Sequence, residues 1–485
     1  MGERGMGRRG PGRGARLSTT RPRRVAEGDM SDVDMLVGVD VGTTRVKAIA
    51  LDLQGVVRAE AERPMPWQHD GKHAQIDPAA IAHLATTVAA DAVTHAGVAS
   101  DHDPRVRGIG VTSMAETGIL VDGSDLPLAP TIAWHDPRGD VETVRREIGT
   151  ERFQSTTGME LGPLPSLVKL IWLRREVPET ARAVRFYAVA EWVVRSLGGE
   201  PVAELSLASR TGMLDIAGAS PWDEAFALLD SPPLIPQPMV AGTPAGTADG
   251  ANVPQVLRGA VLTVAGHDHQ SAAYGAGATA DGALFDSMGS AEALVRTIRA
   301  PLAPERIQRL VDHGISVGWG VVEDHLCILC GIATGLTLER VGLMVGATSR
   351  AERQLLGEAA AALPARAPGL RLRQPRYDGF TVEGITDNVS PAVLWRAAVE
   401  DMVELAEHKL ALIESEAGPY IDVVAGGGWL NNPAVCAAKQ RQYPHLQTTD
   451  LTEPGAYGAA LMAARAAGVA IDNAGVRGLN RRSDQ

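Results

Sequence analysis

The sequence has few of the residues that mark disulfide-rich or zinc-binding proteins. Only three cysteines occur in 485 residues, and aromatic residues make up 4% of the chain. So few cysteines fit a reducing compartment rather than a disulfide-stabilised secreted domain. Cys327 and Cys330 form a single C-x-x-C in an apolar run, and a structural zinc site would need a second pair of ligands. We therefore interpret both as small buried residues.

Long apolar runs and the best-known nucleotide motifs are also missing. The chain contains no stretch of 18 apolar residues and no apolar signal-peptide segment near its start, so we expect no membrane partner and a cytoplasmic location. It contains no G-x-x-x-x-G-K-[ST] pattern, and no G-x-G-x-x-G follows a predicted strand. These absences argue against a P-loop or a Rossmann dinucleotide site.

The charge is acidic overall and unevenly distributed. Residues 1–30 carry a balance of +5, so a formal net charge of −12 leaves −17 on the remaining chain. An acidic body repels a phosphate backbone, and we expect no nucleic-acid partner. Residues 1–34 are rich in Arg and Gly and aperiodic, which predicts a disordered tail; residues 471–485 form a second predicted tail.

The length exceeds one ordinary hydrophobic core, so we expect two domains. A strand–turn–strand unit over 35–61 is followed by a second unit of the same kind over 283–299. This repeat predicts a duplicated α/β protein with a central cleft, divided into domains 35–277 and 278–470. Helices are predicted over 78–97, 166–175, 180–197, 270–277, 336–344, 391–414, 433–442 and 456–467, and a long surface connection over 231–253.

Two turns could bind phosphate. Gly42, Thr43 and Thr44 form a tight turn between two predicted strands, which presents N–H groups and hydroxyls to an anion. Asp40 ends the preceding strand, where a carboxylate can hold Mg²⁺ through its waters. Ser287–Ser290 is the equivalent turn of the second half. Either turn alone could be an ordinary hairpin connection.

A glycine triplet ends another predicted strand. Gly426, Gly427 and Gly428 precede Asn431 and Asn432. Three residues without side chains would let a flat ring or a ribose approach the backbone closely. A flexible loop is the alternative interpretation.

The segment after the predicted strand at 261–265 is rich in side chains that can take part in acid–base chemistry. Gly266 ends the strand, and His267, Asp268 and His269 precede a helix of small residues. A carboxylate there could accept the proton of a hydroxyl group during phosphoryl transfer. The alternative is a helix N-cap, a position that Asp favours.

Residues suited to binding a polyol follow two further strands. Glu116 follows one of them, and Trp134 and Asp136 follow the other. An aromatic ring face and bidentate carboxylate acceptors are typical of polyol sites. The alternative is a core Trp134 beside a surface ion pair between Asp136 and Arg138.

In this order the segments resemble the FGGY family of carbohydrate kinases, within the actin-like ATPase superfamily, from about Met35 to Ala467. Lys169–Trp172 is similar to the family's K-x-x-W helix, and Glu453–Ala460 to its closing E-x-x-A-x-G-A-A. The resemblance implies an α/β fold of two actin-like (ribonuclease H-like) domains with a central cleft, and ATP and Mg²⁺ as cofactors. It implies Asp268 as the catalytic base; Glu116, Trp134, Asp268 and His269 as substrate-binding residues; Asp40 as the metal-associated aspartate; and Gly42, Thr43, Thr44, Ser290, Gly426, Gly427, Gly428 and Asn432 as ATP-binding residues.

The chain also departs from the family pattern. Ala115 stands where the glycerol-kinase form has an Arg before the Glu, and Leu164 stands where it has an aromatic residue. These departures argue against glycerol as the substrate. Asp401 replaces the Gly of the family's R-A-x-x-E-G helix, and His267–His269 is similar to the stretch in fuculose and related deoxy-sugar kinases.

The expected function is ATP-dependent phosphorylation of a hydroxyl of a sugar or polyol, such as a ketose or deoxy-ketose. Three alternatives stay open: an actin-like ATPase acting as a chaperone or filament protein, a non-catalytic sugar-binding relative, and a kinase for a non-sugar alcohol. The expected partner is the small-molecule substrate, and a homodimer is one assembly that the sequence allows.

Overall fold

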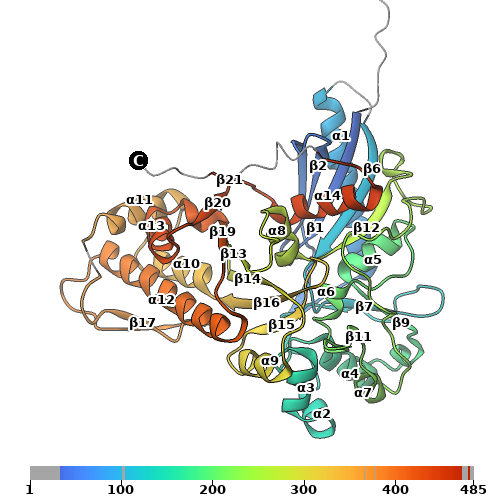
Figure 1. Cartoon of the computed structure of the whole chain (residues 1–485), viewed down its shortest axis with the longest axis horizontal. Coiled ribbons are helices and arrows are strands. Elements are labelled where there is room, and N and C mark those ends of the chain that lie inside the picture. Colours follow the sequence, from blue (N-terminus) through green and yellow to red (C-terminus); the bar gives the residue numbers. More distant parts are fainter. Residues whose placement is uncertain (1–32, 101–103, 365, 377, 472–478, 481–485) are drawn as a thin grey trace, which may run out of the picture.

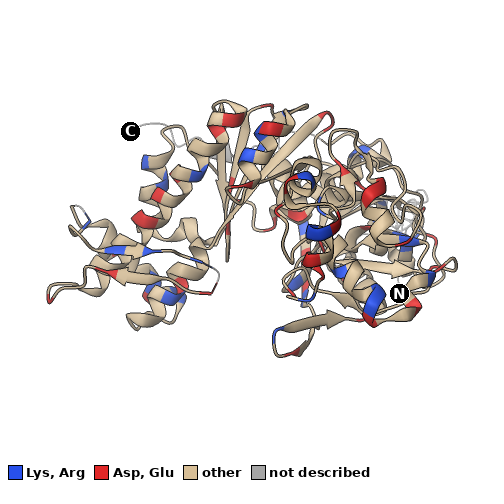
Figure 2. Cartoon of the chain, turned by 90° about the horizontal axis from the view of Figure 1, so that it is seen from below, with Lys and Arg blue, Asp and Glu red and all other residues tan. Residues whose placement is uncertain are grey.

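The computed structural model describes residues 33–100, 104–364, 366–376, 378–471 and 479–480. The chain forms two α/β halves, each built on its own sheet (Figure 1). Figure 2 shows them as two lobes, with acidic and basic residues scattered over both. The predicted tail 1–34 lies outside the described residues except for Val33 and Asp34, which begin the first strand, so that prediction was two residues too long. Of the predicted tail 471–485, Ile471 and the strand Leu479–Asn480 are described.

The first sheet has the strand order β12-β6-β1-β2-β3. β1, β2 and β3 form an antiparallel meander, β6 runs parallel to β1, and β12 runs parallel to β6. The strands are β1 (Val33–Val41), β2 (Arg45–Asp52), β3 (Val57–Pro64), β6 (Pro104–Ser113) and β12 (Val261–His267).

The second sheet repeats this pattern. Its order is β15-β16-β14-β13-β19-β20-β21, in which β13, β14 and β16 form an antiparallel meander, β19 runs parallel to β13 and β20 parallel to β19. The predicted duplication is therefore confirmed. The strands are β13 (Ala283–Met288), β14 (Glu292–Arg299), β15 (Ser316–Trp319), β16 (His325–Ile332), β19 (Asp422–Gly426), β20 (Gln447–Thr449) and β21 (Leu479–Asn480).

Helices cover the sheets, and small sheets extend the edges of both halves. The helices are α1 (Pro78–Ser100), α2 (Val141–Glu147), α3 (Thr150–Thr157), α4 (Ser166–Glu176), α5 (Val189–Ser196), α6 (Leu205–Ala208), α7 (Asp223–Leu228), α8 (Asp268–Gly275), α9 (Pro304–Val311), α10 (Thr334–Met344), α11 (Arg350–Ala361), α12 (Pro391–Ala417), α13 (Pro433–Gln442) and α14 (Pro454–Ala467). The small-sheet strands are β4 (Gln68–Asp70), β5 (His73–Ile76), β7 (Gly118–Val121), β8 (Thr131–Ile132), β9 (Arg185–Ala188), β10 (Leu214–Asp215), β11 (Ser220–Pro221), β17 (Arg371–Arg373) and β18 (Thr381–Glu383).

The last helix, α14, follows the second sheet in sequence but packs on the first. It lies against β1, β6 and β12 (Figure 1, red on blue), and α1 packs on the same sheet within a separate apolar cluster. α8 packs against α14 on one side, and its alanines share an apolar cluster with Phe285 and Val295 of the second sheet. The first residue of α8 is thus held at the junction of the two halves.

Glycines allow α14 to approach the sheet closely. A Cβ on Gly38 would lie 1.8 Å from the carbonyl oxygen of Ala456, and one on Gly110 would lie 2.0 Å from that of Ala459. No real side chain tolerates such a separation from backbone. The abundance of Gly and Ala in this chain therefore reflects, in part, helix-on-sheet contact without intervening side chains.

Two predictions of local structure were wrong. Residues 180–197 do not form one helix, because Phe186 and Tyr187 are buried on β9, which pairs with β7, and α5 starts only at Val189. The connection 231–253 is not confined to the surface, since Leu234, Ile235 and other apolar residues in it are buried. In both cases tertiary packing decides what local composition could not.

No helix among the described residues is long and apolar enough to cross a membrane. Cys327 and Cys330 are buried on β16, as expected, and no group of three potential metal-ligating His, Cys, Asp or Glu side chains occurs in the described part of the chain.

Gly110→Ala should lower the free energy of unfolding by about 3 kcal/mol or more, because the new methyl group would overlap the α14 backbone. Gly123→Ala is the matched control, since a Cβ there meets nothing within 4 Å. Thermal denaturation of both variants checks this. Equal melting temperatures for the two variants would show that α14 does not hold this close position.

Candidate active site

A cavity of about 380 Å³ lies between the halves. The first half contributes polar groups from the turn after β1, the end of β6 and the β12–α8 junction, and the second half contributes mainly small and apolar residues from β14, β15 and β16. The predicted site residues Thr43, Glu116, Trp134, Asp268 and His269 all line this cavity, together with His267, Arg210, Glu160, Leu164, Ala291, Glu292, Ser316, Leu329 and Gly331 among others.

Asp268 is the first residue of α8. Its Oδ1 accepts a hydrogen bond from the backbone N–H of His269 at 2.7 Å and lies 3.4 Å from Nε2 of His267. The N-cap position belongs to His267, so the alternative of Asp268 as the cap is wrong. Burial, with the nearby charge of Glu116, raises the pKa of Asp268 to about 7. Burial lowers the pKa of His267 and of His269, so both imidazoles are neutral near pH 7.

Asp40 ends β1 as predicted. Its Oδ1 is buried and has no hydrogen-bond partner among the described residues. Burial first, and then the charge of Asp268, raise the pKa of Asp40 to about 7. The ammonium of Lys47, opposite Asp40 on β2, is bound by Glu453 at 2.7 Å. The charge of Asp268 thus acts on Asp40, although Asp40 does not itself line the cavity.

The turn after β1, which was predicted to bind phosphate, is linked to the cavity by a hydrogen bond from Trp134. The indole Nε1 of Trp134 donates to Oγ1 of Thr43 at 2.8 Å, and Trp67 donates to the carbonyl of Thr43 at 2.6 Å. Gly42 closes the turn by donating to the carbonyl of Arg45. Gly42 and Thr44 flank Thr43 and do not themselves line the cavity.

Arg210 is a cavity residue that the sequence did not predict. It follows α6, and its guanidinium binds Oε1 of Glu116 through Nε at 2.6 Å and through a second nitrogen at 2.5 Å. Its remaining terminal nitrogen donates to Oγ of Ser316 on β15 at 2.6 Å. No local pattern marks this residue, because its partners lie 94 and 106 positions away in the chain.

The polyol role considered for Asp136 is not supported. Asp136 does not line the cavity; its side chain is 0% exposed, pairs with Arg138 and accepts from the backbone N–H of Ala74 at 2.7 Å. The alternative interpretation, a surface ion pair between Asp136 and Arg138, was partly right: the ion pair exists, but it is buried. Trp134 borders the cavity and also packs against the apolar core of the first half.

A second cavity of about 340 Å³ is lined by residues of the second half. Ser290, Gly428 and Asn432, three of the residues predicted to bind ATP, line it. Arg353 lies over the ring of Trp429, with Cζ 5.9 Å from the ring centroid, and both residues line this cavity. The turn after β13 and the residues after β19 thus line the same cavity.

Gly426 and Gly427, which were also predicted to bind ATP, do not line this cavity. Gly426 is buried within β19, and a Cβ on Gly427 would lie 2.5 Å from the carbonyl oxygen of Met288. The side-chain amide of Asn432 donates to the carbonyl of Arg353 at 2.8 Å, and Asn432 is itself buried. These residues shape the cavity more by backbone and packing than by free polar groups.

A buried polar cluster supports the β13–β14 turn. Lys439 binds Asp286 at 2.8 Å and Glu292 at 2.6 Å, and all three side chains are almost fully buried. Glu292 also accepts from Oγ1 of Thr334 at 2.5 Å. Glu292 also lines the interdomain cavity, and through Lys439 the cluster connects the β13–β14 turn to α13.

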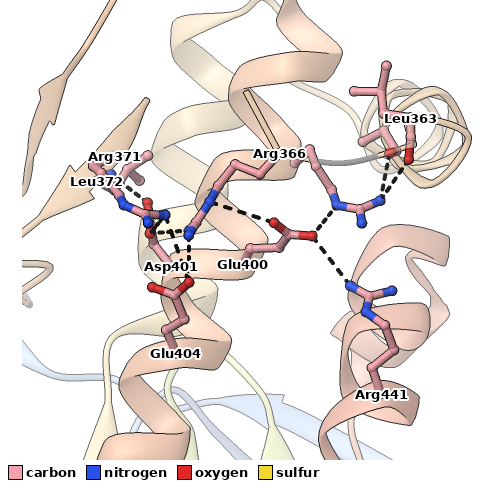
Figure 3. A network of polar contacts seen from close by, with 10 residues as sticks. Leu363, Arg366, Arg371, Leu372, Glu400, Asp401, Glu404 and Arg441 are labelled. Carbon is pink, nitrogen blue, oxygen red and sulfur yellow. Dashed lines mark hydrogen bonds and ion pairs between the residues drawn. The ribbon is translucent and has the colours of Figure 1, made fainter. Parts of the chain in front are cut away.

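Asp401, which departs from the family pattern, joins α12 to β17 (Figure 3). Its Oδ1 accepts from Arg366 at 2.6 Å and from Arg371 at 3.3 Å, and its Oδ2 accepts from the N–H of Leu372 at 2.6 Å. Neither cavity is lined by Asp401. The Asp at this position, where the family pattern has Gly, therefore has a structural role: its carboxylate connects α12 to β17.

Comparison with known proteins agrees with this geometry. Residues 35–275 match the FGGY family of carbohydrate kinases, N-terminal domain. The chain is 30% identical to a glycerol kinase of Aromatoleum aromaticum over 425 residues, which cover 81% of this chain and 82% of that protein. It is 26% identical to an L-fuculokinase of Salmonella typhi over 395 residues, covering 79% and 81% of the two chains.

Among solved structures, the xylulose kinase from Rhodospirillum rubrum superposes with a TM-score of 0.81, covering 92% of each chain at 24% identity. This likeness confirms the predicted fold of two actin-like domains. The polar cavity between those domains, the aspartate at the start of α8 and the sequence relatives lead to one conclusion: this chain belongs to the FGGY family of carbohydrate kinases.

Proposed function

We propose that this carbohydrate kinase transfers the γ-phosphoryl group of ATP to a hydroxyl of a sugar or polyol, with Asp268 as the general base. The observation that carries the proposal is the placement of Asp268: its carboxylate lines the interdomain cavity instead of capping its own helix. Water inside the cavity would compete with the sugar hydroxyl, so closure of the two halves around the substrate would favour transfer over hydrolysis.

The residues around Asp40 fit a divalent cation. A buried carboxylate oxygen without a partner is costly unless a ligand satisfies it, and Oδ1 of Asp40 is such an atom. The absence of a side chain on Gly455 leaves space beside the other oxygen, since a Cβ there would lie 2.5 Å from Oδ2. Asp40 would hold Mg²⁺, directly or through waters, and the ion would supply charge neutralisation for the phosphates.

The chemical step follows from the position of Asp268. Its carboxylate accepts the proton of the sugar hydroxyl while the hydroxyl oxygen forms a bond to the γ-phosphorus. The bond from that phosphorus to the bridging oxygen breaks, and ADP leaves with the electron pair. A carboxylate whose pKa is raised to about 7 is a stronger base than an ordinary aspartate and is still ionised in an appreciable fraction at neutral pH.

The nucleotide would extend from this cavity into the second one. The turns at Thr43 and Ser290 would contact the phosphates, and the backbone at Gly428 would lie against the adenosine. A cytoplasmic location, a homodimer and the absence of a nucleic-acid partner stay predictions of the sequence.

Asp268→Asn should lower kcat by at least about 100-fold, because an amide cannot accept the proton, while the KM for ATP changes little. Steady-state ADP release in the presence of the accepted sugar measures both. Asp223→Asn is the matched control, since Asp223 also begins a helix but is exposed. Unchanged turnover in Asp268→Asn would remove Asp268 from the mechanism, and equally fast ADP release without sugar in the wild type would favour an actin-like ATPase.

The activity should also depend on pH. Asp268 accepts a proton only when ionised, so kcat/KM for the sugar should fall about tenfold per pH unit below about 7 and level off above it. The rates are measured from pH 5.5 to 9 with Mg·ATP saturating at each pH. A profile that stays flat down to pH 5.5 would contradict the raised pKa of this carboxyl group.

A further inference from the structure

The ion pair between Glu116 and Arg210 is an unusual feature of the cavity wall. Both side chains are nearly buried, at 6% and 10% exposure, yet both line the cavity. A buried ion pair loses much of its Coulombic gain to desolvation, so its presence is weak evidence for a role in stability. A role toward a ligand is the better explanation.

The backbone of Glu116 supports this view. Its φ is 58°, in the left-handed region that non-glycine residues seldom adopt, and Oγ of Ser166 holds its carbonyl oxygen at 3.0 Å. Such strain persists where the surrounding structure enforces it, and it concentrates at functional sites. The strained turn directs the carboxylate of Glu116 towards the cavity and Arg210.

The pair offers both kinds of hydrogen-bonding group side by side. Both contacts from Arg210 go to Oε1 of Glu116, and no hydrogen bond to Oε2 is present among the described residues. Of the five N–H donors of a guanidinium, three are occupied by Glu116 and Ser316. One free carboxylate oxygen and two free N–H groups match two neighbouring hydroxyls, each of which donates and accepts.

The charges around the cavity disfavour an acidic ligand. Glu116, Glu160, Asp268 and Glu292 line it, whereas Arg210 is the one Lys or Arg among the lining residues that the structure describes. Lys169, which lies near Glu116, donates to the backbone carbonyls of Pro163 and Leu164 instead. A substrate carboxylate that reached the two free N–H groups of Arg210 would lie beside the carboxylate of Glu116, and the two like charges would repel each other.

We infer that the Glu116–Arg210 pair determines substrate choice, and that it selects a neutral polyol or ketose with adjacent hydroxyl groups over a sugar acid. The inference rests on the proposed kinase function and specifies its substrate class. Because Arg210 also donates to Ser316 on the second sheet, the pair is positioned by both halves. Binding of the two hydroxyls is thereby coupled to the relative position of those halves.

The test uses matched pairs of compounds with the full chain. Ketoses and polyols of five and six carbons are compared with the aldonates of the same length, both by ADP release with Mg·ATP and by calorimetric binding without ATP. The best neutral compound should exceed its aldonate by at least about 100-fold in kcat/KM, because the carboxylate of the aldonate would lie beside the carboxylate of Glu116.

Variants of Arg210 test its role in sugar binding. Arg210→Gln should raise the sugar KM and Kd at least about tenfold, with the KM for ATP within about twofold of wild type. Arg210→Lys should retain part of the affinity, since an ammonium keeps the charge but not the fork of donors. Arg195→Gln is the matched control: Arg195 binds Asp125 through two nitrogens, at 2.8 and 2.6 Å, and does not line the cavity.

These experiments test substrate selection by the Glu116–Arg210 pair separately from the kinase function. An aldonate phosphorylated as well as the neutral compounds would overturn the inference and leave the kinase intact. Calorimetric binding of a neutral compound that Arg210→Gln abolishes, without ADP release from any compound, would support the inference and refute the kinase function. Failure to bind any neutral compound, or unchanged Kd in a folded Arg210→Gln, would overturn the inference.

Discussion

The close contact of α14 with the first sheet is the constraint on which the site depends. α14 rests directly on β1 and β6 because Gly38 and Gly110 carry no side chains. The same helix places Gly455 beside Asp40, and the carbonyl of Gly455 accepts from Oγ of Ser271 on α8. One helix thus fixes the end of β1 and the start of α8, the two places from which the aspartates of the site arise.

The site holds buried carboxylates whose charged forms are disfavoured by burial, so the rest of the fold must offset this loss of stability. Two carboxylates, Asp40 and Asp268, are held where burial raises the pKa of each, and neither forms an ion pair with a Lys or Arg among the described residues. Lys47, which lies opposite Asp40 on β2, forms an ion pair with Glu453 at the start of α14. Buried carboxylates without a cationic partner do not stabilise a fold, and carboxylates with shifted pKa values cluster at functional sites. A bound cation at Asp40 and a substrate hydroxyl at Asp268 would supply the missing partners.

Sequence alone predicts the parts of this architecture that are local. Features set by a few adjacent residues can be predicted from the sequence. They include the turn of Gly and Thr, the glycine triplet at 426–428 and the strand that ends before Asp268. The internal repeat predicts the duplication for the same reason. The strand at 185–188 was missed because its partner strand, not its own composition, decides its conformation. Arg210 was missed because its contacts with Glu116 and Ser316 exist only after both halves fold.

The most direct measurement is a crystal structure with Mg²⁺, a non-hydrolysable ATP analogue and the accepted sugar. The account predicts that a carboxylate oxygen of Asp268 lies within about 3.2 Å of the acceptor hydroxyl, and that this hydroxyl faces the γ-phosphorus with the two halves closed around it. A sugar bound elsewhere, or an Asp268 side chain directed away from the acceptor hydroxyl in the closed complex, would contradict it.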